Sequence, residues 1–380
     1  MKKDNKLNVG IIIGGRSVEH DISILSGLQV YHAIDKSKYN VSIFYITKDL
    51  RWLVGDALKD IITYEEEKYS NLNEVCIYKT KEGVFYRPIK SRKKEQRIDL
   101  FIPVVHGDGI EDGTLIGYLD MLDIPHTASK LTTSAIIQDK ILTKQILSNV
   151  DIPLIKYICM TSNDNYYEIL EKVKEKLGYP VIIKPARLGS SIGITTANDD
   201  SEFKFGVEEA LKYGTRILIE KKIQNMKEYN IAIISNSNKL ITSCIEEVNK
   251  TDDILSFIDK YERDDKLDNK SNRQIPAILS KELEEEIINI CTKAYIYLDI
   301  NGVTRIDTIY DIDKNKIYIN EINTIPGSLA FYLFEKKNID FTMLVNMLIK
   351  DAILTKQKDS KRLKTFVSNV LNKKCIKLNK

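Results

Sequence analysis

Short runs of consecutive apolar residues alternate along the chain with segments in which apolar residues recur at helical spacing. The runs at 7–13 and 100–105 are uninterrupted, which is typical of parallel strands buried on both faces. Residues 18–34 follow the first run after a Gly-Gly turn and predict a helix. A strand, a glycine-rich turn and a helix in this order predict the opening of an open parallel-sheet α/β domain.

The same pattern of apolar and polar residues predicts the other strands and helices. Strands are predicted at 39–46, 75–78, 83–86, 180–184, 217–220 and 229–234, with a connecting strand at 124–128. Helices are predicted at 115–122, 132–147, 166–177, 281–298 and 342–354. The polar stretch 257–276 predicts a mobile loop, and long loops in compact enzymes often act as lids.

Residues 304–328 predict the β-hairpin around which the candidate chemistry is arranged. Branched and aromatic residues alternate with polar ones on both sides of a polar tip, DIDKNK. A turn centred on Lys314 places Asp307 opposite Glu321 and Arg305 opposite Asn323, with all four side chains on one face. Facing carboxylates destabilise a sheet but suit Mg²⁺ shared with substrate phosphates. A solvated polar face is the alternative.

Three loops add candidate chemistry. The turn Asn323-Thr-Ile-Pro-Gly presents backbone N–H groups that can face an anion. The sequence HGDGIEDGT at 106–114 directly follows a predicted strand, which is typical of a functional loop. Lys184 ends another strand before a Gly/Ser loop that can cradle phosphate. Taken alone, a hydrogen-bonded structural role for His106 and a helix-dipole role for Glu19 are the stronger interpretations.

Composition narrows the class of protein. The chain has 380 residues, 43% hydrophobic and 29% charged, which suits two or three domains with real cores. A net charge of +3 with dispersed lysines does not indicate a nucleic-acid partner. Five scattered cysteines without a CxxC pair favour reduced thiols and a cytoplasmic location. The apolar runs are too short for a signal peptide or a membrane span, so no membrane partner is expected.

Five motifs occur in order between Val9 and Gly327: GGRSVEH, HGxxxEDGT, IIKPxRxGSSIG, EKK…EY and RID…NEINTIPG. Together they resemble the D-alanine–D-alanine ligases of the ATP-grasp superfamily. The resemblance implies an α/β fold, α+β in its ATP-grasp part, with three domains. These are an N-terminal open-sheet domain at 1–128, a small ATP-grasp domain at 129–222 and a large one at 223–380 that carries the lid and the metal site.

The resemblance also implies a reaction. ATP phosphorylates the carboxylate of one D-amino acid, and the amine of a second attacks the acyl phosphate. Asp307, Glu321 and Asn323 would hold two Mg²⁺ ions, or Mn²⁺, and Arg305 would stabilise the developing oxyanion. ATP would be bound by residues from several motifs: Lys140, Lys184, Ser190 and Ser191 at the phosphates, Glu220, Lys221 and Ile223 at the adenine, and Glu228 at the ribose.

The substrate site follows from the same resemblance. Glu19 would bind the ammonium of the first D-amino acid, with His106 nearby. The other implied substrate-binding residues are Arg305, Gly327 and Tyr332. A Glu19–Ser190–Tyr261 interaction would close the lid and exclude water from the acyl phosphate. The resemblance further implies D-alanine and ATP as small-molecule substrates, a homodimer, and a role in peptidoglycan precursor synthesis.

Three positions depart from the family pattern. Leu188 replaces a glutamate before the Gly-Ser-Ser, and Ile110 replaces a glycine. Tyr332 stands where the family has a serine that binds the carboxylate of the second substrate. The bulkier phenol leaves open a D-alanine–D-X ligase, where X is D-serine, D-lactate or another amino acid, although Tyr261 favours D-alanine. A non-catalytic ATP-binding protein is a third alternative.

Overall fold

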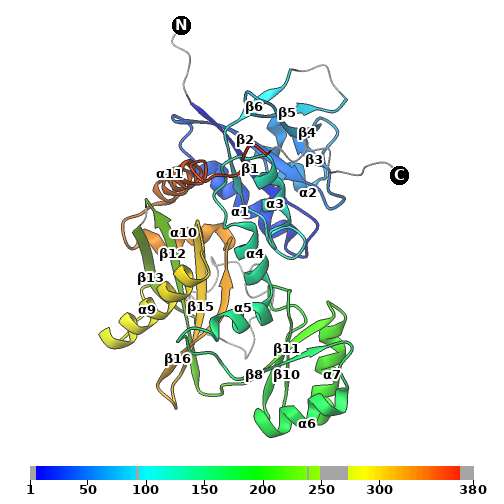
Figure 1. Cartoon of the computed structure of the whole chain (residues 1–380), viewed down its shortest axis with the longest axis vertical. Helices are drawn as coiled ribbons and strands as arrows, with labels where there is room; N and C mark the ends of the chain where they lie inside the picture. The colour runs from blue at the N-terminus through cyan, green and yellow to red at the C-terminus, as the bar shows by residue number, and fades with distance from the viewer. Residues whose placement is uncertain (1–5, 91–93, 238, 249–272, 369–380) are drawn as a thin grey trace.

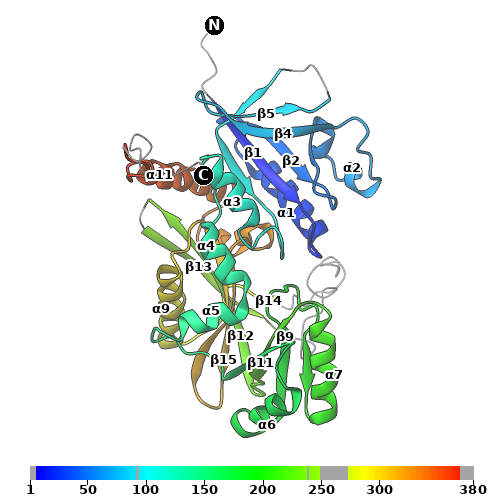
Figure 2. The same ribbon diagram turned by 45° about the vertical axis from the view of Figure 1, so that its right-hand side comes forward.

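The computed structural model describes residues 6–90, 94–237, 239–248 and 273–368. Tyr261 and most of the predicted lid lie outside the described residues. Three sheets follow one another along the long axis of the molecule, each with its own helices (Figures 1 and 2). Each sheet draws its strands from one of the three predicted domains. The division at 128 and 222 stays a prediction.

The first sheet contains the predicted parallel strands. Its order is β6-β5-β4-β3-β2-β1-β7, and β1 runs parallel to both β2 and β7. Between residues 52 and 98 the chain adds antiparallel strands to one edge. The predicted strand at 124–128 is wrong, because only the bridge Phe101–His126 forms there. The elements are β1 (Leu7–Gly14), α1 (His20–Ala33), β2 (Tyr39–Ile46), β3 (Trp52–Val54), η1 (Asp56–Lys59), α2 (Ile62–Glu65), β4 (Asn73–Lys79), β5 (Val84–Pro88), β6 (Gln96–Ile98), β7 (Leu100–Pro103) and α3 (Thr114–Met121).

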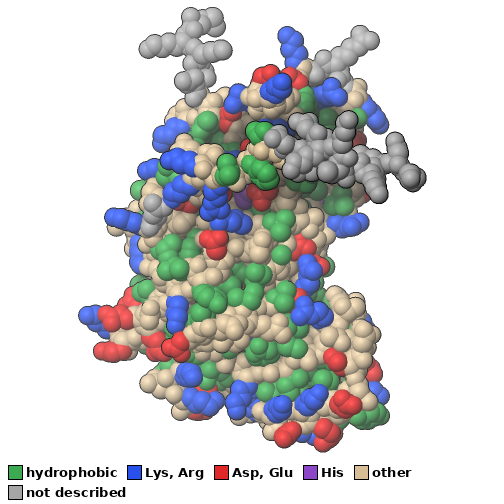
Figure 3. All heavy atoms as spheres, in the orientation of Figure 1, with side chains coloured by type: hydrophobic (Ala, Val, Ile, Leu, Met, Phe, Trp, Pro, Cys, Tyr) green, Lys and Arg blue, Asp and Glu red, His purple; other side chains and the backbone are tan. Residues whose placement is uncertain are grey.

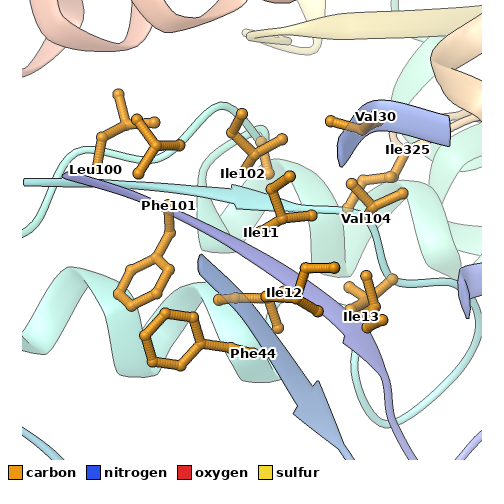
Figure 4. Packing of buried hydrophobic residues seen from close by; sticks show 14 of the residues in the cluster. Ile11, Ile12, Ile13, Val30, Phe44, Leu100, Phe101, Ile102, Val104 and Ile325 are labelled. Atoms are coloured by element: carbon orange, nitrogen blue, oxygen red, sulfur yellow. The ribbon is translucent and has the colours of Figure 1, made fainter. Parts of the chain in front are cut away.

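Apolar side chains from neighbouring strands form the core of this sheet (Figure 4). The rings of Phe44 and Phe101 meet edge to face with centroids 5.1 Å apart. They pass over Gly10, where a Cβ atom would lie 2.4 Å from the Phe101 ring, so a larger residue there would displace the ring. Ile325, from the turn after the predicted hairpin, packs beside Val30 and Val104 in the same core. The sheet therefore anchors one end of the candidate site.

The second sheet is small and antiparallel, in the order β10-β9-β11-β8. Its helices α6 and α7 lie side by side at the end of the molecule opposite the first sheet (Figure 1). Phe203 of α7 is fully buried between them and the strands. The elements are β8 (Tyr157–Thr161), α6 (Tyr166–Lys176), β9 (Val181–Pro185), β10 (Thr195–Ala197), α7 (Asp200–Leu211) and β11 (Arg216–Lys221).

The third sheet lies between the other two, in the order β14-β13-β12-β15-β16. The predicted hairpin is its β15–β16 edge. Helix α11 packs on this sheet and shares a core with the first one. The elements are α4 (Leu131–Gln138), α5 (Lys140–Leu147), β12 (Met226–Asn236), β13 (Lys239–Val248), β14 (Arg273–Gln274), α9 (Lys281–Tyr297), β15 (Val303–Asp311), β16 (Lys316–Asn323), η2 (Gly327–Ala330), α10 (Phe331–Glu335) and α11 (Phe341–Asp359).

The single helix predicted at 132–147 is wrong, because the chain breaks at Asp139 into α4 and α5. Asp139 has extended backbone angles, and its carboxylate accepts hydrogen bonds from the N–H groups of Ile141 and Leu142 at 3.0 Å each. This is an N-cap, which competes with continuation of the helix. The break also lets the Lys140 N–H donate to the Ala186 carbonyl at 2.8 Å. It therefore ties Lys140 to the second sheet.

The surface carries mixed charge. Lysine and arginine side chains are interspersed with aspartate and glutamate over the face in Figure 3. In the described part of the chain, no helix combines the length and the apolar character needed to cross a bilayer.

Candidate active site

The β15–β16 hairpin brings the predicted metal residues together. Asp307 lies opposite Glu321 and Arg305 opposite Asn323, so both predicted pairs are confirmed. Nearer the tip, Thr308 pairs with Ile319, which makes Asn320 an extra residue in β16. Such a bulge shifts the register by one residue and re-aims the side chains that follow. The predicted turn centre at Lys314 is wrong, because Asp311 pairs with Lys316 and the tip is therefore centred between residues 313 and 314. Without the bulge, this register would place Asn320 opposite Asp307.

Arg305 and Asp307 form a two-pronged ion pair. The Arg305 Nε and Nη2 donate to the two Asp307 carboxylate oxygens at 2.6 and 2.8 Å. The Asn323 amide also donates to Asp307, at 3.2 Å. Burial lowers the pKa of Arg305, but Asp307 more than offsets this, so the pKa rises well above its usual value. The guanidinium therefore stays charged at any physiological pH.

The hairpin residues fit a magnesium site that substrate oxygens complete. Asp307, Glu321 and Asn323 offer two carboxylates and one amide oxygen on one face. Among the described residues, no group of three or more His, Cys, Asp and Glu side chains forms a metal cage by itself. Mg²⁺ characteristically takes only one or two carboxylates and shares phosphate and water oxygens. The donor set therefore suits Mg²⁺ bound together with a nucleotide.

Two residues that the sequence reasoning missed extend this polar row. Asn230 on β12 lies directly opposite Asp307, and Glu246 on β13 lies directly opposite Asn230. The Asn230 amide donates to the Glu246 carboxylate at 3.0 Å. Glu246 is only 1% exposed. The alternation of polar Glu228 and Asn230 along β12 was the available signal, but the strand pairing was not predictable from it.

Tyr332 reaches the same site from α10. The Arg273 guanidinium lies 5.7 Å from the centre of its ring, and the Arg273 Nε lies 3.7 Å from a Glu246 oxygen. Burial raises the pKa of Tyr332, and Glu246 adds to the rise, so the phenol stays protonated. Arg305 and Asp307 also act on this phenol electrostatically. A protonated tyrosine hydroxyl is thus available near Arg305 as a hydrogen-bond donor.

Lysines from two other elements converge on the hairpin. The Lys140 ammonium lies 2.9 Å from a Glu321 oxygen, and it donates to the Leu188 carbonyl at 2.6 Å. The Lys184 ammonium lies 2.5 Å from Glu220 and donates to the Asn320 side chain at 3.2 Å. Two positive groups therefore stand beside the carboxylates. This arrangement can hold a polyphosphate between lysines and a cation.

The predicted adenine and ribose residues are arranged along β11 and β12. The Glu220 carboxylate is buried against lysines, and Lys221 donates to the carbonyls of Gly178 and Tyr179. Ile223 packs against a small apolar cluster of Ile155, Ile309 and Tyr318, which it shares with Met226. Glu228 lies two residues before Asn230 on β12. Their contact with a nucleotide stays a prediction.

Glu19, just before α1, and Ser190, in the loop between β9 and β10, contact each other. The Ser190 hydroxyl donates to a Glu19 carboxylate oxygen, and both residues are about nine-tenths buried. Ser190 and Ser191 have φ angles of 53° and 59°, which are strained for residues other than glycine. The loop 106–114 reinforces this junction, since Arg187 pairs with Asp108 and Asp112 at 2.7 Å. The third predicted member, Tyr261, lies outside the described residues.

His106 and Glu111 hold the turn after β16. The Glu111 carboxylate accepts the N–H groups of Gly107 at 3.0 Å and Ile325 at 3.2 Å. His106 also bonds to the Ile325 backbone, and burial lowers the pKa of His106 to about 4, so the imidazole stays neutral. The Ile325 N–H is therefore engaged and cannot face an anion as predicted. Beside Gly327, by contrast, a Cβ atom would meet nothing within 4 Å.

Glu111 makes stability depend on pH. Burial raises the pKa of its carboxyl to about 8. The hydrogen bonds from the two N–H groups favour the ionised form and lower the pKa, but burial outweighs them. A raised carboxyl pKa means that the folded state binds the proton more tightly than the unfolded chain, whose pKa is near 4.5. The stabilisation is therefore complete below about pH 4.5 and is lost as the pH rises through about 8.

We expect Glu111→Gln to flatten the pH dependence of the melting temperature between pH 6 and pH 9, measured by thermal melts of both proteins. The exposed Glu168→Gln on α6 is the matched control and should follow the wild type. Parallel curves for Glu111→Gln and the wild type would contradict the assignment.

Comparisons with known proteins agree with this geometry. Residues 8–129 match the family model described as D-ala D-ala ligase N-terminus, and residues 146–350 match D-ala D-ala ligase C-terminus. The D-alanine–D-alanine ligase of Thermosipho melanesiensis is 36% identical over 371 residues, covering 96% of this chain and 98% of that protein. The Staphylococcus haemolyticus ligase of the same name is 34% identical, covering 94% and 98%.

Solved structures show the same fold. The D-alanine-D-alanine ligase of Coxiella burnetii superposes with a TM-score of 0.81 at 24% identity, covering 94% of this chain and 96% of that one. The VanG D-Ala:D-Ser ligase of Enterococcus faecalis has a TM-score of 0.78 at 25% identity, covering 92% and 100%.

Proposed function

The chain belongs to the D-alanine–D-alanine ligase family, and we propose that it joins two D-alanines into D-alanyl-D-alanine while converting ATP to ADP and phosphate. The product would enter peptidoglycan precursor synthesis. The observation that carries the proposal is the hairpin face of Arg305, Asp307, Glu321 and Asn323, with two lysines converging on it. Carboxylates, a guanidinium and lysines in this arrangement suit phosphoryl transfer to a carboxylate.

The residues then take distinct roles. Asp307, Glu321 and Asn323 would hold Mg²⁺, which when bound neutralises charge on the transferred phosphoryl group. Lys140 and Lys184 would bind the ATP phosphates. The Arg305 guanidinium donates to both oxygens of Asp307. Its planar fork suits the acyl phosphate and the developing oxyanion.

Glu19 and the turn after β16 would position the first D-alanine. Glu19 is a buried carboxylate and would bind the substrate ammonium. The open space beside Gly327 suits the approach of a substrate carboxylate. Closure over the site, with Ser190 and Tyr261 joining Glu19, would keep water from the acyl phosphate. We further propose that the enzyme works in the cytoplasm as a homodimer, which analytical ultracentrifugation would test, and that Mn²⁺ can replace Mg²⁺.

A different acceptor is the second candidate function. Tyr332 fills a position near Arg305 that the family gives to a smaller serine, and a phenol there narrows the space for the second substrate. A D-Ala:D-Ser ligase is among the similar solved structures. The residues proposed to bind ATP are the same for both candidates. The second substrate alone distinguishes them.

The test is ADP release with Mg²⁺, ATP and D-alanine as the only amino acid, followed by mass spectrometry of the product. We expect ADP release and a D-alanyl-D-alanine mass, because Tyr332 can donate the hydrogen bond that a serine would. Release only after adding D-serine, D-lactate or another acceptor would support the second candidate. Tight ATP binding without turnover on any acceptor would indicate a non-catalytic protein.

A further inference from the structure

Lys144 is a buried lysine for which the proposed reaction has no role. It lies on α5, one helical turn after Lys140, and its side chain is 3% exposed. Its ammonium lies 2.7 Å from one oxygen of Glu220, while the other Glu220 oxygen lies 2.5 Å from the ammonium of Lys184. One buried carboxylate therefore bridges two lysines, and it is only 1% exposed.

The surroundings make these charges interact strongly. Ile141, Ala186 and Leu218 form an apolar cluster that Tyr157 flanks, and the Lys144 ammonium lies 5.8 Å from the centre of the Tyr157 ring. Charges buried among apolar groups are costly unless they are paired, and their mutual attraction is screened little. The two lysines lower the pKa of Glu220 to about 2, although burial alone would raise it. Glu220 is therefore ionised at neutral pH.

A simple structural ion pair would need only one of these lysines. With both present, the cluster of Lys144, Glu220 and Lys184 carries a net charge of +1 at the edge of the candidate nucleotide site. Lys184 is held from both sides, because it also donates to Asn320 at the β16 bulge, next to Glu321. The surplus positive charge thus stands beside the residues proposed to bind Mg²⁺.

We propose that Lys144 is a positioning residue for ATP binding, which neutralises Glu220 so that the positive charge of Lys184 remains available to the ATP phosphates. The inference rests on the proposed role of Lys184. Without Lys144, the negative charge of Glu220 would cancel the positive charge of Lys184, which lies 2.5 Å from it. The Glu220 side chain then acts as a bridge between lysines, and Glu220 would contact the adenine through its backbone only.

Charge arithmetic gives a test in which two substitutions compensate each other. Lys144→Met keeps the length of the side chain and lowers the cluster charge from +1 to zero. We expect it to raise the KM and the dissociation constant for ATP about tenfold, the effect of one unit charge acting over roughly 12 Å at an effective dielectric constant of about 20. Combining Lys144→Met with Glu220→Gln returns the charge to +1, and we expect this double variant to bind ATP several-fold more tightly than Lys144→Met alone.

Calorimetric titration with ATP and Mg²⁺ gives the dissociation constants, and thermal melts report folding. Lys144→Arg should retain ATP affinity, since the charge is kept. The matched control is Lys212→Met, which removes an exposed lysine that is also paired with a glutamate, Glu209. It should leave ATP binding unchanged.

Two results would overturn the inference. One is a Lys144→Met protein that melts earlier but binds ATP within twofold of the wild type, which would make the lysine purely structural. The other is a double variant that binds ATP no better than Lys144→Met. Lys184→Met separates the inference from its premise, because ATP binding that survives this change would overturn the proposed role of Lys184 itself.

Discussion

Replacing Asp307 by asparagine is expected to reduce ADP formation about a thousandfold or more. A metal ion supplies several kcal/mol of charge stabilisation to phosphoryl transfer, and about 1.4 kcal/mol corresponds to a tenfold change in rate. The substitution removes one of the two carboxylates on the hairpin face and the ion pair that holds Arg305. Glu321→Gln is expected to act in the same direction. The measurement is steady-state ADP release with D-alanine at saturating ATP.

The hairpin offers its own control for this prediction. Asp313 lies at the tip of the same hairpin and bonds to the Asn225 side chain at 2.7 Å, away from the metal face. Asp313→Asn should retain wild-type activity and a similar melting temperature. Varying the Mg²⁺ concentration gives a second measurement, because loss of a metal-binding side chain should raise the Mg²⁺ concentration that the enzyme needs. If Asp307→Asn released ADP at the wild-type rate and Mg²⁺ dependence, the metal assignment would be wrong.

Arg305→Lys is expected to lower kcat by about a hundredfold to a thousandfold, the size of effect that follows loss of one donor to a developing oxyanion. Lysine keeps the charge but not the planar fork that contacts both Asp307 oxygens. Because we assign Arg305 to the acyl phosphate and not to ATP, the dissociation constant for ATP should change less than about threefold. Steady-state ADP release at saturating substrates and calorimetric ATP titration measure the two quantities.

Arg97→Lys is the matched control, since Arg97 also forms an ion pair with a neighbouring aspartate but lies in the first sheet, more than half exposed. It should change neither quantity. An Arg305→Lys enzyme with normal kcat and weakened ATP binding would move Arg305 from the acyl phosphate to the nucleotide.

The elements that were predicted correctly depend on residues that lie close together in the sequence. The apolar run at 7–13, the glycine turn and the following helix are each set by side chains close together in sequence. Alternation places Arg305 and Asp307 on one face of β15, whereas the pairing of Asp307 with Glu321 depends on the bulge at Asn320. No local pattern in the sequence predicts this bulge.

The single helix predicted at 132–147 failed because a local rule was outweighed by capping. Apolar spacing continues through Asp139, but its carboxylate binds the N–H groups of the next turn, and Lys140 joins the second sheet. In a sequence, an aspartate at such a position fits either a helix N-cap or a polar position inside a continuous helix. The choice between the two depends on Ala186, which lies far along the chain.

The chemical groups of the candidate site and the strands that carry them could be identified from the sequence. It contained the two carboxylates, the amide and the guanidinium of one hairpin face, and a lysine before a Gly/Ser loop. Three further contacts depend on how the chain packs: Glu246 and Asn230 continue that face, Glu111 holds Ile325, and Lys144 and Lys184 share Glu220. These contacts join segments that are distant in sequence. Periodicity describes which face a residue occupies, whereas the partner across that face is set by how whole sheets and helices pack.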